Sequence, residues 1–128
     1  VLGRSKIVGL PLTNMLIERG ATVTCCNSTT MSTGFYTRNA DYVFSAIGIP
    51  NYFDFSDFLN FCELVVDIGI NRDKDNKLCG DVNNVDFERY LNNTYVTPVP
   101  GGVGLLTRLV LMENTLNAYK IQKNERMI

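Results

Sequence analysis

Blocks of apolar residues along this chain predict strands that alternate with helices. Residues 41–47 and 63–69 are continuously apolar at their centres and end at glycine, which is typical of strands buried on both faces of a parallel sheet. A shorter alternating block at residues 21–26 and a last one at residues 94–97 are rich in β-branched and aromatic residues. We therefore expect four strands. A further strand at the start of the chain is expected to pair with them.

Apolar side chains at helical spacing fall between these strands. They predict helices over residues 11–19, 55–62 and 85–91 and a long amphipathic helix from residue 104 onward. Gly20 stands where a C-terminal helix cap belongs. A turn-rich stretch after the block at residues 63–69 predicts a hairpin that pairs residues 68–70 with residues 77–80.

This order of elements predicts an α/β fold, a Rossmann-like three-layer domain with a mainly parallel sheet and right-handed crossovers. With 128 residues, 45% of them hydrophobic, we expect a single domain over residues 1–128. A buried strand needs about five residues, yet only Val1 and Leu2 precede the first glycine, and no methionine begins the chain. We expect a truncated first strand and a fragment of a longer protein.

Charge and cysteine content narrow the possible functions. The 12 Lys and Arg and 13 Asp and Glu residues are scattered, which disfavours nucleic acid and anionic membranes as partners and favours a small molecule. No apolar run approaches the roughly 20 residues of a membrane span. There is no histidine, so His-dependent catalysis is excluded. Without C-x-x-C spacing we expect no metal site and reduced, buried thiols in an intracellular protein, at Cys25, Cys26, Cys62 and Cys79.

Ligands of open parallel sheets bind at the carboxyl ends of the strands. Here the loops at residues 3–8, 27–30, 48–50 and 69–71 fall at that edge. The first loop carries glycines only at its ends, so it matches neither G-x-G-x-x-G nor the P-loop pattern. It predicts a phosphate cradle before a helix, with a simple reversing turn as the alternative.

The second loop bears on the choice of nucleotide. Domains that select NAD place an acid near the end of the second strand, where it binds the ribose 2′-hydroxyl and would repel a 2′-phosphate. This loop has hydroxyls instead, at Ser28 and Thr29, and Arg4 can approach from the first loop. We therefore predict NADP as the cofactor in preference to NAD. The alternative, that Ser28 and Thr29 cap a following helix, can hold at the same time.

Several motifs together resemble one known family. The chain carries G-R-S-K-I-V-G at residues 3–9, D-I-G-I-N-R at residues 67–72, G-D-V at residues 80–82 and P-V-P-G-G-V-G at residues 98–104. In this order they resemble the C-terminal NAD(P)-binding domain of the bifunctional methylenetetrahydrofolate dehydrogenase/methenyltetrahydrofolate cyclohydrolases, from the first residue to about Tyr119. The chain departs from the family at Leu105 and Leu106, where Pro and Met are usual, and at Thr29, where a cation is common.

The resemblance implies a two-domain parent enzyme that oxidises methylenetetrahydrofolate with NADP and hydrolyses the methenyl product. It implies a homodimeric, cytoplasmic parent, with mitochondria as the alternative location, and folate binding through an N-terminal domain that this chain lacks. It also implies the site residues. Cofactor contacts would come from Gly3, Arg4, Ser5, Ser28, Gly48 and Ile70, and the folate cleft would be lined by Pro100, Gly101 and Gly104.

We assign no catalytic residue to this chain. The catalytic lysine of the family lies in a Y-x-x-x-K helix of the N-terminal domain, and the one such spacing here, Tyr119 to Lys123, falls at the end of the last helix, where no pocket would preorganise it. The chain alone is therefore expected to be inactive. Two other hypotheses stay open: a stand-alone NADP-binding regulatory module without turnover, and a Rossmann-like domain of a different dehydrogenase.

Overall fold

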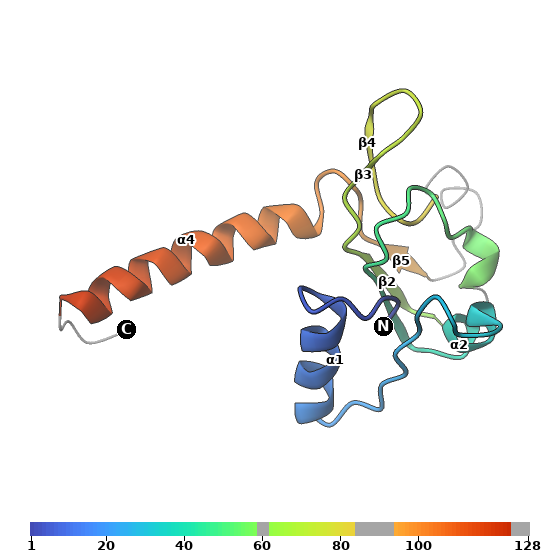
Figure 1. Ribbon diagram of the computed structural model, residues 1–128, viewed down its shortest axis with the longest axis horizontal. Coiled ribbons are helices and arrows are strands. Elements are labelled where there is room, and N and C mark those ends of the chain that lie inside the picture. Colours follow the sequence, from blue (N-terminus) through green and yellow to red (C-terminus); the bar gives the residue numbers. More distant parts are fainter. Residues whose placement is uncertain (59–61, 84–93, 124–128) are drawn as a thin grey trace.

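A parallel sheet forms the centre of the domain (Figure 1). The structure, a computed structural model, describes residues 1–58, 62–83 and 94–123. Strands β1 (Tyr42–Ser45), β2 (Leu64–Asp67) and β5 (Tyr95–Val96) lie side by side in the order β1-β2-β5, and both pairings are parallel. The α/β class with a parallel sheet is confirmed, as are the strands predicted around these three.

The start of the chain extends this sheet beyond β1. Leu2 forms parallel bridges with Ser45 on one side and with Cys26 on the other. Its amide donates to the Phe44 carbonyl (2.8 Å), and the Gly3 amide donates to the Cys26 carbonyl (2.9 Å). In chain order the sheet therefore runs 2-1-3-4-5, and the direction of winding switches between the first segment and β1.

The strand predicted over residues 21–26 forms only at its end. The Val1 amino group donates to the Thr24 carbonyl (2.8 Å), and the Cys26 amide donates to the Val1 carbonyl (2.8 Å). Within the part of the chain that the structure describes, only the short first segment pairs with this stretch. The β-ladder therefore reaches no further back than Thr24, and most of the predicted strand is extended chain without a β-partner.

Helix α1 (Gly9–Glu18) follows the first loop and confirms the first predicted helix, two residues earlier than expected. It ends in a Schellman motif, in which the Gly20 amide donates to the Ile17 carbonyl and the Ala21 amide to the Leu16 carbonyl. Gly20 adopts φ 86°, so its predicted place at the helix end is confirmed. A short helix α2 (Thr33–Arg38) was not predicted, because its six residues are too few to display a helical period.

Some of the remaining predicted elements are confirmed, and others fall on residues that the structure does not describe. Strands β3 (Asn71–Arg72) and β4 (Leu78–Cys79) pair antiparallel, so a hairpin forms with its first strand slightly later than predicted. The helix expected over residues 55–62 begins as a 3₁₀ turn, η1 (Phe55–Asp57). Residues 59–61 and the helix predicted over residues 85–91 lie outside the described residues.

The last helix, α4 (Val103–Gln122), extends away from the sheet, and none of its side chains is buried (Figure 1). Leu105, Leu109, Met112 and Leu116, which follow one face of this helix, are all more than half exposed. Among the described helices, none combines the length and the apolar character needed to cross a membrane.

The core lies where the sheet meets the 50–58 segment. It comprises the buried residues Leu2, Cys26, Val43, Phe53, Phe58, Cys62, Val65 and Val82. Cys26 and Cys62 pack within it, whereas Cys25 and Cys79 are half-buried, and all four thiols are free. The prediction of reduced thiols is confirmed, and the prediction of burial holds fully for two of the four.

Thiol reactivity should separate the four cysteines. Burial raises the pKa of the Cys26 and Cys62 thiols, so both are protonated at neutral pH and shielded from reagents. We expect an alkylating reagent to modify Cys25 well before Cys26 and Cys62 in the folded chain. Fragmentation mass spectrometry of timed samples measures this order. All four should react at similar rates in denaturant, and equal rates in the folded chain would contradict the buried placement.

Candidate nucleotide-binding site

The first loop joins the end of the Val1–Leu2 segment to α1 and is stabilised by its own serine. The Ser5 hydroxyl accepts from the Val8 amide (3.2 Å), and the Ser5 carbonyl accepts from the Leu10 amide (3.0 Å). Gly3 adopts φ 105°, a conformation that favours glycine. The loop is therefore a fixed turn at the start of a helix, and amides of a helix start suit a phosphate group.

The second loop is closed by its asparagine. The Asn27 side-chain oxygen accepts from the Thr29 amide (3.0 Å) and the Thr29 hydroxyl (2.6 Å), and the Asn27 amide donates to the Thr30 hydroxyl (2.9 Å). The Ser28 side chain is exposed and makes no hydrogen bond within the described part of the chain. It is thus available to a ligand. The alternative that Ser28 and Thr29 cap a helix is wrong, since α2 begins after Ser32 and has no side-chain cap.

These two loops meet at one cavity of about 380 Å³ beside the switch point of the sheet. Gly3, Arg4, Ser5 and Ser28, all predicted cofactor contacts, lie together in its wall. The opposite wall is apolar and aromatic, and is formed by Ile47, Ile49, Tyr52 and Phe53. The described residues around this cavity include no Asp or Glu, and Arg4 is their only cation. We call it the adenosine-side cavity, because Arg4 and Ser28 are predicted to bind the 2′-phosphate of the cofactor.

Gly48 lies between two residues of this cavity wall and adopts φ 73°. Its amide donates to Asp81 Oδ1 (3.1 Å), so the backbone donor of this predicted cofactor residue is already engaged. The amides of Ile47 (2.8 Å) and Ile49 (3.2 Å) donate to the same carboxylate. Any contribution of Gly48 to a ligand must therefore come from its position in the loop rather than from its N–H.

Ile70 and the predicted folate-cleft residues gather at a second, smaller cavity of about 150 Å³. Ile70 is 71% exposed and lies there with Pro100, Gly101 and Gly104, at the start of α4. Arg108 adds a cation on the first turns of that helix. The structure thus places Ile70 with the predicted folate-cleft residues and apart from the other five predicted cofactor residues. We call this the nicotinamide-side cavity, because the nicotinamide is predicted to meet the folate there.

Two buried carboxylates, one of which lines the nicotinamide-side cavity, were not singled out from the sequence. Asp67 at the end of β2 and Asp81 after β4 are about 1% and 0% exposed. Burial raises the pKa of the Asp67 carboxyl. This effect outweighs the hydrogen bonds from the backbone amides of Val82, Asp81 and Gly69, which lower the pKa. The sequence offered one signal for these buried aspartates, which is the glycine close to each of them in D-I-G and G-D-V. A glycine leaves room for a buried carboxylate to approach the backbone.

Comparison with known proteins identifies the family of this chain. Residues 1–123 match the family model described as the tetrahydrofolate dehydrogenase/cyclohydrolase NAD(P)-binding domain. The chain belongs to this family. The resemblance seen in the motifs is confirmed, and the described adenosine-side cavity lies in an NAD(P)-binding domain.

Relatives in the tetrahydrofolate dehydrogenase/cyclohydrolase family match almost the whole chain. The bifunctional protein FolD of Nitrosomonas europaea is 48% identical over 124 residues, which is 96% of this chain and 41% of that protein. The crystal structure of the FolD methylenetetrahydrofolate dehydrogenase/cyclohydrolase from Campylobacter jejuni superposes with a TM-score of 0.83 at 42% identity, over 94% of this chain and 42% of that one. The bifunctional enzyme from Thermoplasma acidophilum gives 0.83 at 39% identity, with coverages of 97% and 44%.

The chain therefore spans about two fifths of the length of the family members it matches. These matches support the α/β fold directly, since they cover the sheet and both cavities. Among the described residues there is no group of three or more His, Cys, Asp or Glu side chains placed to hold a metal ion.

Proposed function

We propose that this chain is the cofactor-binding domain of a methylenetetrahydrofolate dehydrogenase/methenyltetrahydrofolate cyclohydrolase that uses NADP. The observation that carries the proposal is the adenosine-side cavity, where Arg4 and Ser28 lie in one wall without a carboxylate among the described lining residues. An acid there would select the 2′-hydroxyl of NAD, whereas a guanidinium and a hydroxyl suit a 2′-phosphate. Family membership supports the wider class of nucleotide.

The residues present fit such a cofactor. A Cβ on Gly3 would lie 2.4 Å from the Ala46 carbonyl oxygen, so the loop has room for close backbone approach only with glycine at this position. The turn of Gly3, Arg4 and Ser5 would hold phosphate oxygens at the start of α1. Arg4 and Ser28 would bind the 2′-phosphate, and Tyr52 offers an aromatic face in the same cavity. Gly48 would shape the path between the two halves of the site.

At the other cavity, Ile70 would border the nicotinamide, and Pro100, Gly101 and Gly104 would line the cleft in which folate meets it. When bound, NADP supplies the oxidising power by accepting a hydride from the folate substrate. The residues of this chain bind and orient the nucleotide and exclude water from an apolar surface at Ile70 and Leu78. We assign no proton transfer to them.

Partners of the whole protein are part of the same proposal. Because the matched relatives are more than twice as long as this chain, we infer that folate binding and the catalytic side chains reside mainly outside these residues. We further propose a homodimeric, cytoplasmic parent enzyme, in keeping with free thiols in the described structure. A methylenetetrahydrofolate oxidation assay on the full-length protein, with NADP and with NAD, tests the activity and separates it from a binding module without turnover.

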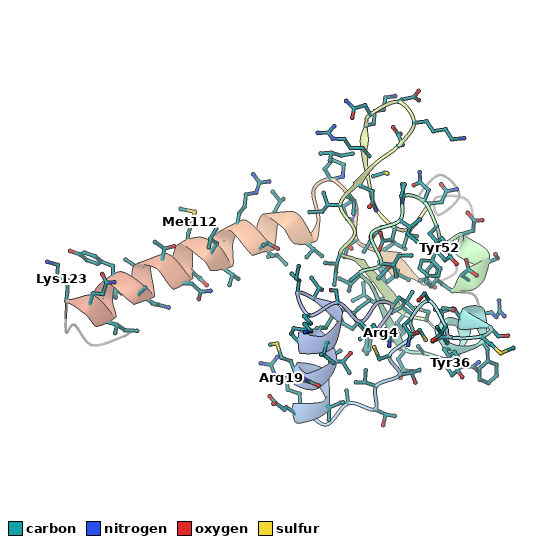
Figure 2. The ribbon with its side chains drawn as sticks, in the orientation of Figure 1. Arg4, Arg19, Tyr36, Tyr52, Met112 and Lys123 are labelled. Carbon is teal, nitrogen blue, oxygen red and sulfur yellow. The ribbon has the colours of Figure 1, made fainter. Side chains whose placement is uncertain are left out.

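Replacing Arg4 with alanine tests the cofactor assignment in this chain. We expect NADP binding to weaken by about 1.5 to 3 kcal/mol, the value of a hydrogen bond to a charged group, while NAD binding changes little. Isothermal titration calorimetry with both nucleotides measures the difference. Figure 2 shows Arg4 within the body of the domain and Arg19 on the far turn of α1, so Arg19→Ala is the matched control that removes the same charge elsewhere.

The control should leave both affinities unchanged. Equal NADP affinity before and after the Arg4 substitution would refute the 2′-phosphate contact. Equal losses of NADP and NAD affinity would instead place Arg4 against a phosphate that the two nucleotides share.

A further inference from the structure

We propose that Asp81 is a positioning residue, which fixes the wall of the adenosine-side cavity. Together with Asp67, it also fixes the position of that wall relative to the nicotinamide-side cavity. This inference rests on the proposed nucleotide site. It concerns a buried carboxylate that contacts neither cavity as a lining residue, so its influence on a nucleotide acts through the loops that it holds.

The first part of the argument is the set of backbone groups that Asp81 accepts. Three successive amides donate to its carboxylate, Ile47 to Oδ2 and Gly48 and Ile49 to Oδ1, at 2.8, 3.1 and 3.2 Å. Ile47 and Ile49 themselves line the adenosine-side cavity. A loop whose three consecutive amides converge on one buried charge has little freedom, so the carboxylate sets where this wall stands.

Two side chains tie the same carboxylate to the flanking strands. The Ser45 hydroxyl at the end of β1 donates to Oδ2 (2.9 Å), and the Asn71 side-chain amide at the start of β3 donates to Oδ1 (2.9 Å). Asn71 directly follows Ile70 of the nicotinamide-side cavity. Asp81 thus joins the loop after β1 to the loop after β2, and these two loops lie at different cavities.

Asp67 continues the connection. Its carboxylate accepts from the amides of Gly69 (3.0 Å), Asp81 (3.1 Å) and Val82 (3.0 Å), and its own amide donates to the Thr97 hydroxyl (2.9 Å). Gly69 lies in the nicotinamide-side cavity, and Thr97 directly precedes the 98–104 run that forms half of its wall. The two aspartates therefore link both cavities through hydrogen bonds between buried groups.

Two glycines keep space for these carboxylates. A Cβ on Gly69 would lie 2.2 Å from Asp81 Oδ1, and a Cβ on Gly80 would lie 1.8 Å from Asp67 Oδ2. Any other residue at either position would displace a carboxylate. This explains, in physical terms, why D-I-G and G-D-V occur as units in the chain: each aspartate fits only against the glycine near the other.

The test compares Asp81→Asn with a core variant in the same domain. Asparagine keeps the size of the side chain but replaces one acceptor oxygen with an amino group, which opposes the Ile47 amide or the Gly48 and Ile49 amides. We expect NADP affinity to fall on the order of tenfold, the equivalent of about one lost hydrogen bond. The control, Val65→Ala, removes buried methyl groups from β2 away from both cavities and should leave NADP affinity unchanged.

Amide hydrogen exchange gives the readout that a merely structural role would not move. In the unaltered chain without nucleotide, we expect slow exchange at residues 47–49. Asp81→Asn should accelerate these amides relative to those of β1, whereas Val65→Ala should accelerate both sets together through global unfolding. If Asp81→Asn does not fold, Ser45→Ala serves as the milder variant, with a smaller loss of NADP affinity in the same direction.

The outcomes separate the two proposals. No binding of NADP or NAD by the unaltered chain would overturn the proposed function. Unchanged NADP affinity in folded Asp81→Asn would overturn the positioning role alone. Rapid exchange at residues 47–49 in the unaltered chain, as fast as in the hairpin turn, would also overturn it. Affinity losses that simply follow the loss of stability in both Asp81→Asn and Val65→Ala would reduce Asp81 to a structural residue.

Discussion

Replacing Gly9 with alanine is expected to abolish measurable NADP binding by this domain. A Cβ on Gly9 would lie 2.0 Å from the Gly3 carbonyl oxygen, 2.6 Å from the Gly3 carbonyl carbon and 3.0 Å from the Arg4 nitrogen. All three atoms belong to the backbone, so no flexible side chain can move aside. Either α1 or the phosphate-binding loop must shift, which moves the backbone amides that would hold the phosphate. We therefore expect NADP affinity to fall below the range that calorimetry measures.

Calorimetric titration of the folded variant measures this loss, with circular dichroism to confirm that the fold persists. Gly34→Ala is the matched control, because it also adds a methyl group to a helical glycine. The nearest atoms there belong to the guanidinium group of Arg38, which can move. The control should bind NADP normally. Normal binding by Gly9→Ala would show that the loop tolerates displacement and would weaken its assignment as the phosphate cradle.

The contact between Gly3 and Gly9 also explains how far sequence reasoning could go at this loop. The two glycines were recognisable, but their spacing fits neither common nucleotide-binding pattern, so the local signal was weak. In the structure they pack against each other where the loop meets α1. The spacing is the consequence of a backbone contact across five intervening residues, and such a contact is invisible until the turn is built.

Local patterns otherwise predicted what depends on local structure. The buried strands β1 and β2, helix α1 and its glycine end were readable because burial and capping leave a mark within a few residues. The stretch at residues 21–26 shows the limit, since its β-rich composition was clear but a strand also needs a partner of equal length. Pairing is a property of two segments, and among the described residues only Val1 to Gly3 pairs with this stretch.

The role of Asp81 could not be predicted from the sequence. Its partners Ser45 and Ile47 are 36 and 34 residues away in the sequence, and a single aspartate after a glycine resembles any exposed turn residue. The motif containing it could be recognised as part of a family without any indication of what the side chain does. Only the folded chain brings the carboxylate to the amides, so tertiary structure supplies the explanation that the motif lacks.

Replacing Leu105, Leu109, Met112 and Leu116 together with glutamine is expected to change the association state of this chain. These side chains are 53%, 54%, 72% and 53% exposed and follow one another at spacings of four and three residues on one face of α4. Contiguous exposed apolar surface favours association. We expect the unaltered chain to self-associate as its concentration rises and the substituted chain to associate more weakly, because Leu106, Val110 and Leu111 stay exposed elsewhere on α4. Sedimentation velocity over a range of concentrations measures both.

A matched control places the same kind of substitution on the opposite face of α4. Thr107, Asn114 and Asn117 lie there by helical spacing, and their replacement with glutamine leaves the apolar face intact. This variant should associate like the unaltered chain. A monodisperse monomer at every concentration in the unaltered chain would contradict the prediction.

The glutamine substitution of the four apolar residues should also reveal what stabilises α4. Helix nucleation is unfavourable, and in proteins most of the stability of a helix comes from packing of its apolar face rather than from intrinsic propensity. In this chain α4 buries no side chain, so its apolar face is stabilised only when another surface covers it. Helicity measured by far-ultraviolet circular dichroism should therefore rise with concentration in the unaltered chain. In the glutamine variant this rise should be smaller, since glutamine favours helix about as well as leucine does but offers no apolar side chain to pack.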